Sequence, residues 1–282
     1  MADYEVTASG KNFWAAFHEI YSLWALEREG LRDGYFEKLY LKQHRFRFES
    51  LAAEITRIPH VESILDIGVS PFTYILRRLM PAADINTLDM NDIQKTCCEK
   101  YNIQFKEVDL LKEALPWPDE CFDVVALAEV IEHLPCHPGP ILRECWRVLK
   151  PGGTLITSTP NFACLYNRVR MLLGWHVQEM WVENDLPGRF HYREYIKSEL
   201  VQEIKSSGFE ILKASHNRYW DKLPCFSDML DARYWIKYIP LGKLGIALLW
   251  AIYAAAYVPL TCIIPPFRRG INIVARRLSN TG

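Results

Sequence analysis

The sequence lacks the paired cysteines of a zinc site or a disulfide framework. Its eight cysteines are scattered, no CxxC pair occurs, and the adjacent Cys97 and Cys98 cannot easily form a structural bridge. This pattern fits a reducing compartment. The first residues also lack a basic start followed by an apolar core, so we expect no secretory signal.

The chain also lacks an excess of charge of either sign. Its 33 lysines and arginines stand against 34 aspartates and glutamates, which gives a net charge of −1. Because no global field attracts polyanions, extensive nucleic-acid binding is not expected. No internal repeats stand out. The 282 residues, half of them hydrophobic, can bury one full core and supply a smaller appendage.

A strand, a glycine turn and a helix follow one another over residues 63–79, and together they make a ligand-binding edge. The strand contains Asp66 and runs into Gly68. Some 21 residues after Gly68, a second apolar strand ends on Asp89, where a doubly wound sheet places the acid that holds a ribose diol. A third strand-like run closes on Asp109.

Strand and helix patterns continue to alternate from residue 62 to 215. Apolar runs over residues 123–127 and 154–157 have the character of central strands. A last helix is predicted over residues 195–207, with Gly208 as its cap before a return strand. This alternation predicts an α/β fold with a mainly parallel, buried sheet and helices on both faces.

The order and spacing of these pieces, from about residue 50 to 215, resembles the class I S-adenosylmethionine-dependent methyltransferases. The resemblance implies a Rossmann-like, doubly wound, mainly parallel sheet of seven strands. It also implies that the first turn faces the methionine part of S-adenosylmethionine, the second acid binds the ribose hydroxyls and the third lies near the adenine. Carried over by position, the cofactor-binding residues are Asp66, Gly68, Ser70, Asp89, Met90, Asp109, Leu110 and Glu129.

The first turn departs from the family pattern. Members usually carry two or three glycines there, whereas this chain has only Gly68, with Ser70 and Phe72 at the later positions. Glycine permits a close approach of the backbone to a ligand and a positive φ. We therefore expect a reshaped cofactor pocket. A non-catalytic, membrane-bound scaffold whose turn no longer admits the cofactor is the alternative.

Two glutamates and a histidine lie together after the strand that ends near residue 128. Glu129, Glu132 and His133 have the spacing i, i+3, i+4 and share one face if the segment is helical. His191 follows, shortly before the last helix. Either histidine could act as a general base, because imidazole titrates near neutral pH. Purely structural roles are also open.

This ExxEH pattern with a later histidine resembles two methyltransferase branches that use a divalent ion. These are the ubiquinone-biosynthesis O-methyltransferases and the small-RNA 3′-terminal 2′-O-methyltransferases. The resemblance implies that a cation such as Mg²⁺ or Zn²⁺ holds the hydroxyls of the substrate. The implied ligands are Glu129, Glu132, His133 and His191.

The chain divides into three parts by pattern. Residues 1–58 carry apolar groups at helical spacing and predict two helices, either over the cofactor or packed on the sheet edge. Residues 59–220 form the S-adenosylmethionine-binding domain, in which residues 162–192 are expected to form a lid over the substrate. Residues 221–282 are expected to be a hydrophobic and basic segment that associates with a membrane.

The last part contains 24 consecutive uncharged residues, 244–267. Their length would cross a bilayer, but Pro259 would kink or end a helix late in the run. Basic residues flank both ends, so a re-entrant or in-plane hydrophobic helix fits better than a full span. Residues 267–278 have the pattern of an amphipathic stretch attracted to anionic lipid. A buried helix or a homodimer interface is the alternative.

Together these patterns predict a cytoplasmic methyltransferase that is bound peripherally or monotopically to a membrane. The predicted reaction is O-methylation of a lipid or lipid-linked acceptor, such as a quinone or a glycan. Oxygen is favoured over nitrogen because no Asn/Asp-Pro-Pro-Tyr motif is present and because histidines are available to deprotonate a hydroxyl. Carbon methylation of an activated ring is also open. A small-RNA methyltransferase would share the metal ligands, but it would need a basic RNA-binding face.

Overall fold

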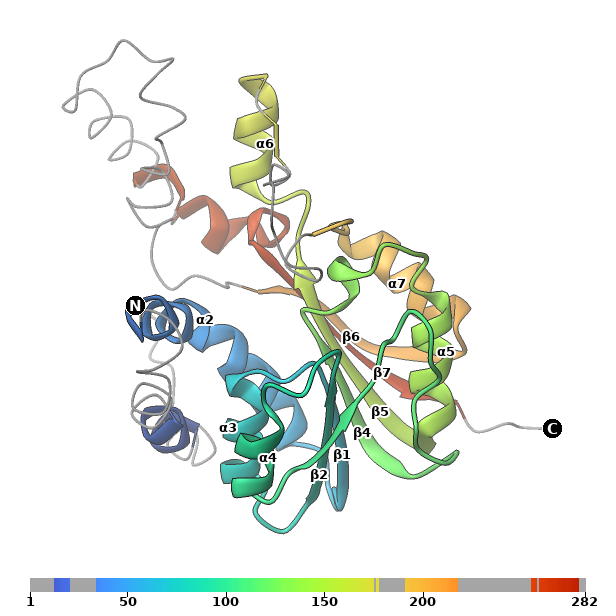
Figure 1. Cartoon of the computed structure of the whole chain (residues 1–282). Coiled ribbons are helices and arrows are strands. Elements are labelled where there is room, and N and C mark those ends of the chain that lie inside the picture. Colours follow the sequence, from blue (N-terminus) through green and yellow to red (C-terminus); the bar gives the residue numbers. More distant parts are fainter. Residues whose placement is uncertain are drawn as a thin grey trace.

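The computed structural model describes residues 13–20, 34–174, 176–177, 191–217, 255–257 and 259–278, with side chains omitted for 34–43. A seven-stranded sheet with the order β3-β2-β1-β4-β5-β7-β6 forms its centre (Figure 1). The strands are β1 (Ser63–Ile67), β2 (Asp84–Asp89), β3 (Gln104–Glu107), β4 (Phe122–Ala128), β5 (Leu149–Pro160), β6 (Phe209–Asn217) and β7 (Gly270–Arg277).

The first five strands pair in parallel, and β7 runs antiparallel to both β5 and β6. The sheet is therefore mainly parallel and doubly wound, as predicted. The carboxyl ends of the parallel strands all lie at one edge, where ligands bind in folds of this kind. The acids that end or follow these strands lie along that edge.

Helices cover both faces of the sheet (Figure 1). They are α2 (Gly34–Ile55), α3 (Pro71–Leu79), α4 (Lys95–Lys100), α5 (Gly139–Val148), α6 (Leu165–Leu172) and α7 (Lys197–Ser206), with short 3₁₀ turns η1 (Ile131–His133) and η2 (Pro265–Phe267). A further helix spans residues 13–20. In Figure 1, α5 and α7 lie on one face, and α2, α3 and α4 lie on the other.

Neighbouring residues of each central strand contribute to two different cores. In β1, Leu65 packs in the core beneath α5 and α7, whereas Ile64 packs in the core beneath α2 and α3. In β4, Val125 and Val124 divide in the same way. Because both faces are covered, these strands are apolar throughout, which is why the sequence pattern is so easily read there.

The predicted last helix and return strand are confirmed as α7 and β6. Gly208 joins them with φ +95°, and a Cβ on it would lie 3.1 Å from the indole nitrogen of Trp146. Both the left-handed backbone and the lack of space favour glycine at this position. The two helical segments predicted before the sheet are also present.

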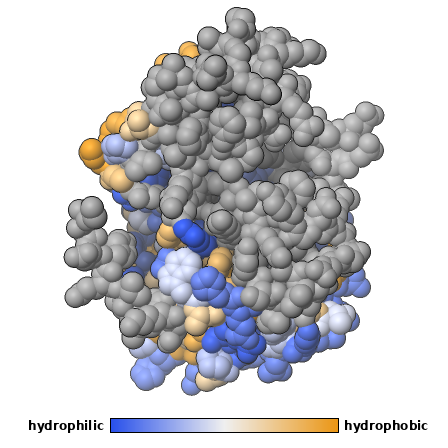
Figure 2. All heavy atoms as spheres, turned by 90° about the vertical axis from the view of Figure 1, so that its left-hand side faces the viewer, coloured by the Kyte–Doolittle hydropathy of each residue, from blue (hydrophilic) through white to orange (hydrophobic). Residues whose placement is uncertain are grey.

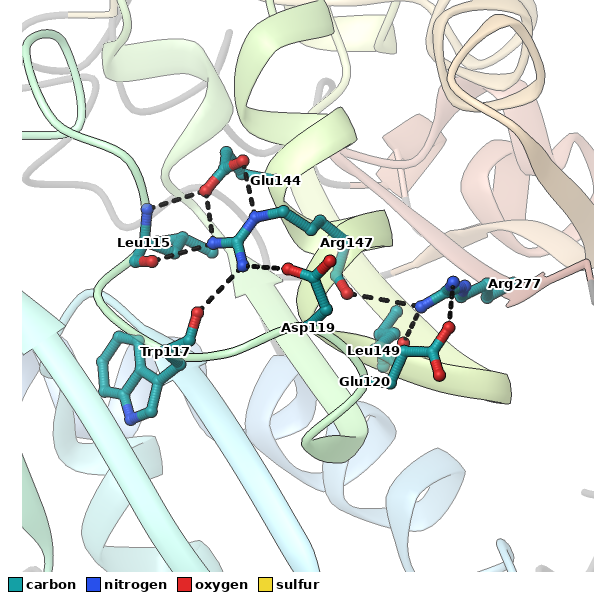
Figure 3. A network of polar contacts seen from close by, with 8 residues as sticks. All are labelled: Leu115, Trp117, Asp119, Glu120, Glu144, Arg147, Leu149 and Arg277. Carbon is teal, nitrogen blue, oxygen red and sulfur yellow. Dashed lines mark hydrogen bonds and ion pairs between the residues drawn. The ribbon is translucent and has the colours of Figure 1, made fainter.

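The prediction that residues 267–278 face lipid is wrong, because most of them form β7 inside the sheet. Ile271 and Ile273 are fully buried between β5 and β6. Arg277 is 4% exposed, donates to the carbonyl of Leu149 and pairs with Glu120 at 2.7 Å (Figure 3). Arg277 therefore takes part in contacts within the protein and does not face lipid.

The same network fixes the loop before β4. Arg147 of α5 pairs with Glu144 at 2.8 Å and with Asp119 at 2.7 Å, and it donates to the carbonyls of Leu115 and Trp117 (Figure 3). This network lies near the amino end of β4. It is therefore separated from the carboxyl edge of the sheet, where folds of this kind bind ligands.

Much of the uncharged run, including residues 244–254, lies outside the described residues, so the expected hydrophobic helix stays a prediction. Residues 259–263 are helical and lead into η2. Among the described residues, no helix is both long enough and apolar enough to cross a bilayer. Of the expected lid, the structure describes α6 and its flanks, while residues 178–190 lie outside.

Candidate active site

The first turn begins at Gly68, directly after β1. Gly68 has φ +86°, donates to the carbonyl of Leu88 at 3.0 Å, and leaves only 3.1 Å between a hypothetical Cβ and the side chain of Val130. A larger residue would be strained by its backbone and crowded by its neighbour. The one glycine that the turn retains is thus the one that its geometry requires.

The two residues that replace the family's later glycines have roles within the protein. Ser70 is the N-cap of α3, and together with Thr73 it forms a capping box. Phe72 is buried and stacks on Phe48 of α2, with ring centroids 5.9 Å apart. The altered turn is therefore explained by helix capping and core packing. A direct contact of Ser70 with a cofactor stays a prediction.

Asp66 lies beneath this turn and is only 1% exposed. The hydroxyl of Thr73 donates to its carboxylate at 2.6 Å, which ties β1 to the first turn of α3. Burial raises the pKa of Asp66 from its ordinary value to about 7, in spite of that hydrogen bond. Asp66 thus supports the turn from below and is protonated at mildly acidic pH.

We expect the protein to lose stability as the pH rises from about 4 to about 7, in part through Asp66. In this range Asp66 keeps its proton in the folded protein, whereas the unfolded chain has released it. The free energy of unfolding therefore falls by about 1.4 kcal/mol for each pH unit. Asp66→Asn should flatten this dependence. Denaturant titrations of the native protein and the variant at pH 5 and pH 8 measure the free energy of unfolding. The same change in this free energy between the two pH values in both proteins would contradict the assignment.

Asp89 ends β2 beside the same turn. Its carboxylate accepts from the backbone N–H of Met90 at 2.7 Å and of Val69 at 3.3 Å, and burial raises its pKa. The side chains of Met90 and Ile93, which follow it, are 47% and 69% exposed. An acid backed by apolar side chains suits a ribose hydroxyl pair next to a flat base.

Asp109 follows β3 at the next position along the edge. Its carboxylate pairs with Lys112 at 2.7 Å, which lowers its pKa, and accepts from the backbone N–H of Leu111 at 3.0 Å. Leu110 packs partly against the core. The carboxylate shapes its own turn, and a contact with the adenine stays a prediction.

Glu129, directly after β4, forms a link that the sequence did not reveal. It has φ +58° and pairs with Arg47 of α2 at 3.0 Å, where the two side chains are 14% and 4% exposed. Ser158 of β5 also donates to it at 2.9 Å. Arg47 thus brings a buried guanidinium to the binding edge. Nothing in its local pattern distinguishes it from the other basic residues of α2.

The structure brings together three of the four predicted metal ligands. Ligand atoms of Glu132, His133 and His191 all lie within 4.8 Å of one another. The rings of His133 and His191 meet edge to face with centroids 4.9 Å apart. The predicted helical face is not formed, because only residues 131–133 make a 3₁₀ turn and the positive φ of Glu129 directs it to Arg47.

Glu132 is the most buried member of this cluster, with 0% exposure. Thr159 donates to its Oε2 at 3.0 Å, whereas its Oε1 has no hydrogen-bond partner among the described residues. Burial, followed by the charge of Glu129, raises the pKa of Glu132 to about 8. A buried carboxylate oxygen in this state suits a proton or a cation.

His191 is held by residues from two segments. Its Nδ1 lies 3.0 Å from Oε1 of Glu194, and Oε2 of Glu194 lies 3.4 Å from the amide nitrogen of Asn167 on α6. A pocket of about 500 Å³ adjoins Glu194 and is lined by Phe162, Glu194, Ile196, Ser198, Glu199 and Gln202. Neither histidine lines this pocket, and Glu194 is its one link to the cluster, through the contact with His191.

Comparison with known proteins agrees with this arrangement. Residues 65–157 match a family model described as a methyltransferase domain. A probable S-adenosylmethionine-dependent methyltransferase of Mycolicibacterium smegmatis is 38% identical over 98 residues, which are 34% of this chain and 32% of that protein. A ubiquinone biosynthesis O-methyltransferase of Xylella fastidiosa is 33% identical over 138 residues, 48% of this chain and 52% of that protein.

The matches thus span about a third of the first relative and about half of the second. Among solved structures, a SAM-dependent methyltransferase of Archaeoglobus fulgidus superposes with a TM-score of 0.55 at 17% identity, over 87% of this chain and all of that one. At this identity the likeness shows the fold alone. Sheet order, domain match and relatives agree that the chain carries a class I S-adenosylmethionine-dependent methyltransferase domain.

Proposed function

We propose that this protein methylates a hydroxyl group of a lipid or lipid-linked acceptor, with S-adenosylmethionine as the donor. The observation that carries the proposal is the cluster of Glu132, His133 and His191 at the same sheet edge as Asp89 and the glycine turn. One group of residues suits the nucleoside of the donor, and the other suits proton removal from an acceptor.

The residues at the edge fit the donor. Gly68 itself carries no side chain in this turn, and the carboxylate of Asp89 can accept hydrogen bonds from two ribose hydroxyls. Arg47, already at this edge through Glu129, is placed to attract the carboxylate of the methionine part. The bound donor would supply a methyl group on a positively charged sulfur.

Methyl transfer to oxygen needs a base and an aligned acceptor. In the proposal, an imidazole of His191 or His133 accepts the hydroxyl proton as the oxygen forms its bond to the methyl carbon. The carbon–sulfur bond breaks, and its electrons remain on the sulfur. An imidazole suits this step because it changes protonation state near neutral pH.

The same three side chains fit a divalent cation. Two imidazoles and a carboxylate are ordinary ligands for Zn²⁺, whereas Mg²⁺ prefers oxygen donors, and Oε1 of Glu132 has no hydrogen bond to give up within the described structure. A cation held there would orient the acceptor hydroxyls and lower their pKa. Glu129 is not part of this set, because Arg47 and Ser158 engage it.

The surface near the site supports an apolar acceptor at a membrane. Helix α6 projects beyond the sheet at the top of Figure 1, and its end carries Met171, Leu172 and Leu173 at 46%, 86% and 53% exposure. Its polar residues include Arg168 and Arg170 but no acid. A small group of hydrophobic residues also shows at the upper left of Figure 2, above a mainly hydrophilic base. Apolar tips backed by arginines suit an anionic lipid surface.

Calorimetry with S-adenosylmethionine, followed by a methyl-transfer assay, tests the proposal. We expect micromolar binding of the donor. We also expect faster methylation of a polyprenylated catechol in detergent micelles than of the same catechol without the prenyl chain. Failure to bind the donor would overturn the proposal, and equal rates on both acceptors would remove its lipid part.

Treating the enzyme with a metal chelator distinguishes the two proposed roles of the histidines, which are cation binding and proton removal. Activity that is lost after chelation and restored by Mg²⁺ or Zn²⁺ assigns the cluster to a cation. Activity that survives thorough chelation assigns it to proton removal by imidazole alone.

A further inference from the structure

The orientation of His191 is set by one carboxylate. Oε1 of Glu194 lies 3.0 Å from Nδ1 of His191, and the two side chains are 16% and 26% exposed. A carboxylate accepts hydrogen bonds but does not donate them. Nδ1 must therefore carry the proton in this contact, and the opposite nitrogen, Nε2, is left as the basic atom.

Glu194 is in turn held by Asn167, whose amide orientation is not arbitrary. The amide nitrogen of Asn167 lies 2.9 Å from the carbonyl oxygen of Phe162 and 3.4 Å from Oε2 of Glu194. Both neighbours are acceptors, so the group that faces them must be the amide NH₂. Asn167 is 6% exposed, which leaves the contact little competition from water.

We propose that Glu194 is a positioning residue that, secured by Asn167, fixes the tautomer and ring orientation of His191 so that Nε2 serves the acceptor. The inference rests on the proposed function for the role of Nε2 in methyl transfer. The chain Asn167, Glu194 and His191 joins α6, which belongs to the expected lid, to the histidine pair at the sheet edge. The lid helix thereby helps to hold the base in its working form.

The structure makes the outcome of Glu194→Gln specific. The NH₂ of Asn167 would draw the oxygen of the introduced amide towards itself, so the introduced NH₂ would face Nδ1 of His191. An NH₂ donates, which forces Nδ1 to accept and moves the ring proton to Nε2. We expect a reversed tautomer, a kcat lower by about 10- to 100-fold, and an unchanged affinity for S-adenosylmethionine.

Two-bond ¹⁵N–¹H spectra of metal-free protein read the tautomer directly, with His191 assigned by comparison with His191→Ala. In an Asn167→Ala background the introduced amide can turn its oxygen to His191, so Glu194→Gln should there lower kcat less than in the native background. A purely structural role for Glu194 would give no such rescue. Glu203→Gln is the matched control, because Glu203 pairs with His137 at 3.2 Å outside the cluster.

An unchanged His191 tautomer in Glu194→Gln would overturn the inference, and so would an equal loss of kcat in both backgrounds. The spectra need neither donor nor acceptor. A protein that shows the expected tautomer reversal but no methyl transfer would thus contradict the proposed function while leaving the positioning of His191 by Glu194 in place.

Discussion

Asp89→Ala is expected to weaken the binding of S-adenosylmethionine at least about 100-fold and to leave the fold intact. The carboxylate would accept two hydrogen bonds from the ribose, and charge-assisted bonds of this kind contribute about 1.5 to 3 kcal/mol each. Losing both corresponds to about two to four orders of magnitude in affinity. The residue also anchors the N–H groups of Val69 and Met90, so the first turn loses support in the same variant.

The matched control is Asp84→Ala on the same strand. Asp84 begins β2 at the opposite edge of the sheet, where it is exposed and accepts from Gln104 at 3.0 Å. Calorimetry should show native affinity for this variant, and circular dichroism should show a folded protein for both. Equal affinities of native protein and Asp89→Ala would remove the cofactor site from this edge.

His191→Ala is expected to lower kcat for methyl transfer by about two to four orders of magnitude, the usual contribution of a positioned general base. The same loss follows if His191 holds a cation, since one of its three ligands would be gone. Binding of S-adenosylmethionine should change less than about twofold, because the residues that suit the donor lie in other segments of the chain. Single-turnover rates with saturating donor measure the chemical step separately from binding.

His137→Ala is a suitable control, since the side chain of His137 is 69% exposed and pairs with Glu203 outside the cluster. It should keep native activity. If His191→Ala retained native kcat, neither proton removal nor cation binding by this residue could explain catalysis. A parallel loss in donor affinity would instead indicate that the variant disturbs the sheet edge as a whole.

The central part of the fold was predictable because its signals are local. Strands that are buried on both faces must be apolar along their whole length, and β1 and β4 show this without any knowledge of their partners. Acids at strand ends are equally visible, because the carboxyl ends of parallel strands meet at one edge. Asp66, Gly68 and Asp89 therefore lie at the first turn and the end of β2, as the sequence indicated, although their contacts with a cofactor remain to be measured.

The end of the chain shows the opposite case. Isoleucines alternating with polar residues, followed by arginines, fit either an amphipathic surface segment or a strand. Which of these two structures forms depends on the segment with which the residues pair. Here β7 pairs with β5, more than a hundred residues earlier in the chain. Once Arg277 finds Glu120 and a backbone carbonyl, its charge can be buried, which no local pattern reveals.

The sequence by itself determined the order of the strands' apolar runs, the acids at the binding edge and the histidines near them, since each depends on neighbours along the chain. Tertiary structure alone decided which of those groups meet. The positive φ of Glu129 sends its carboxylate to Arg47, 82 residues away, while a 3₁₀ turn directs Glu132 and His133 towards His191. Contacts between distant segments depend on how the helices pack across the sheet. The spacing of residues along the sequence does not reveal which distant residues this packing brings together.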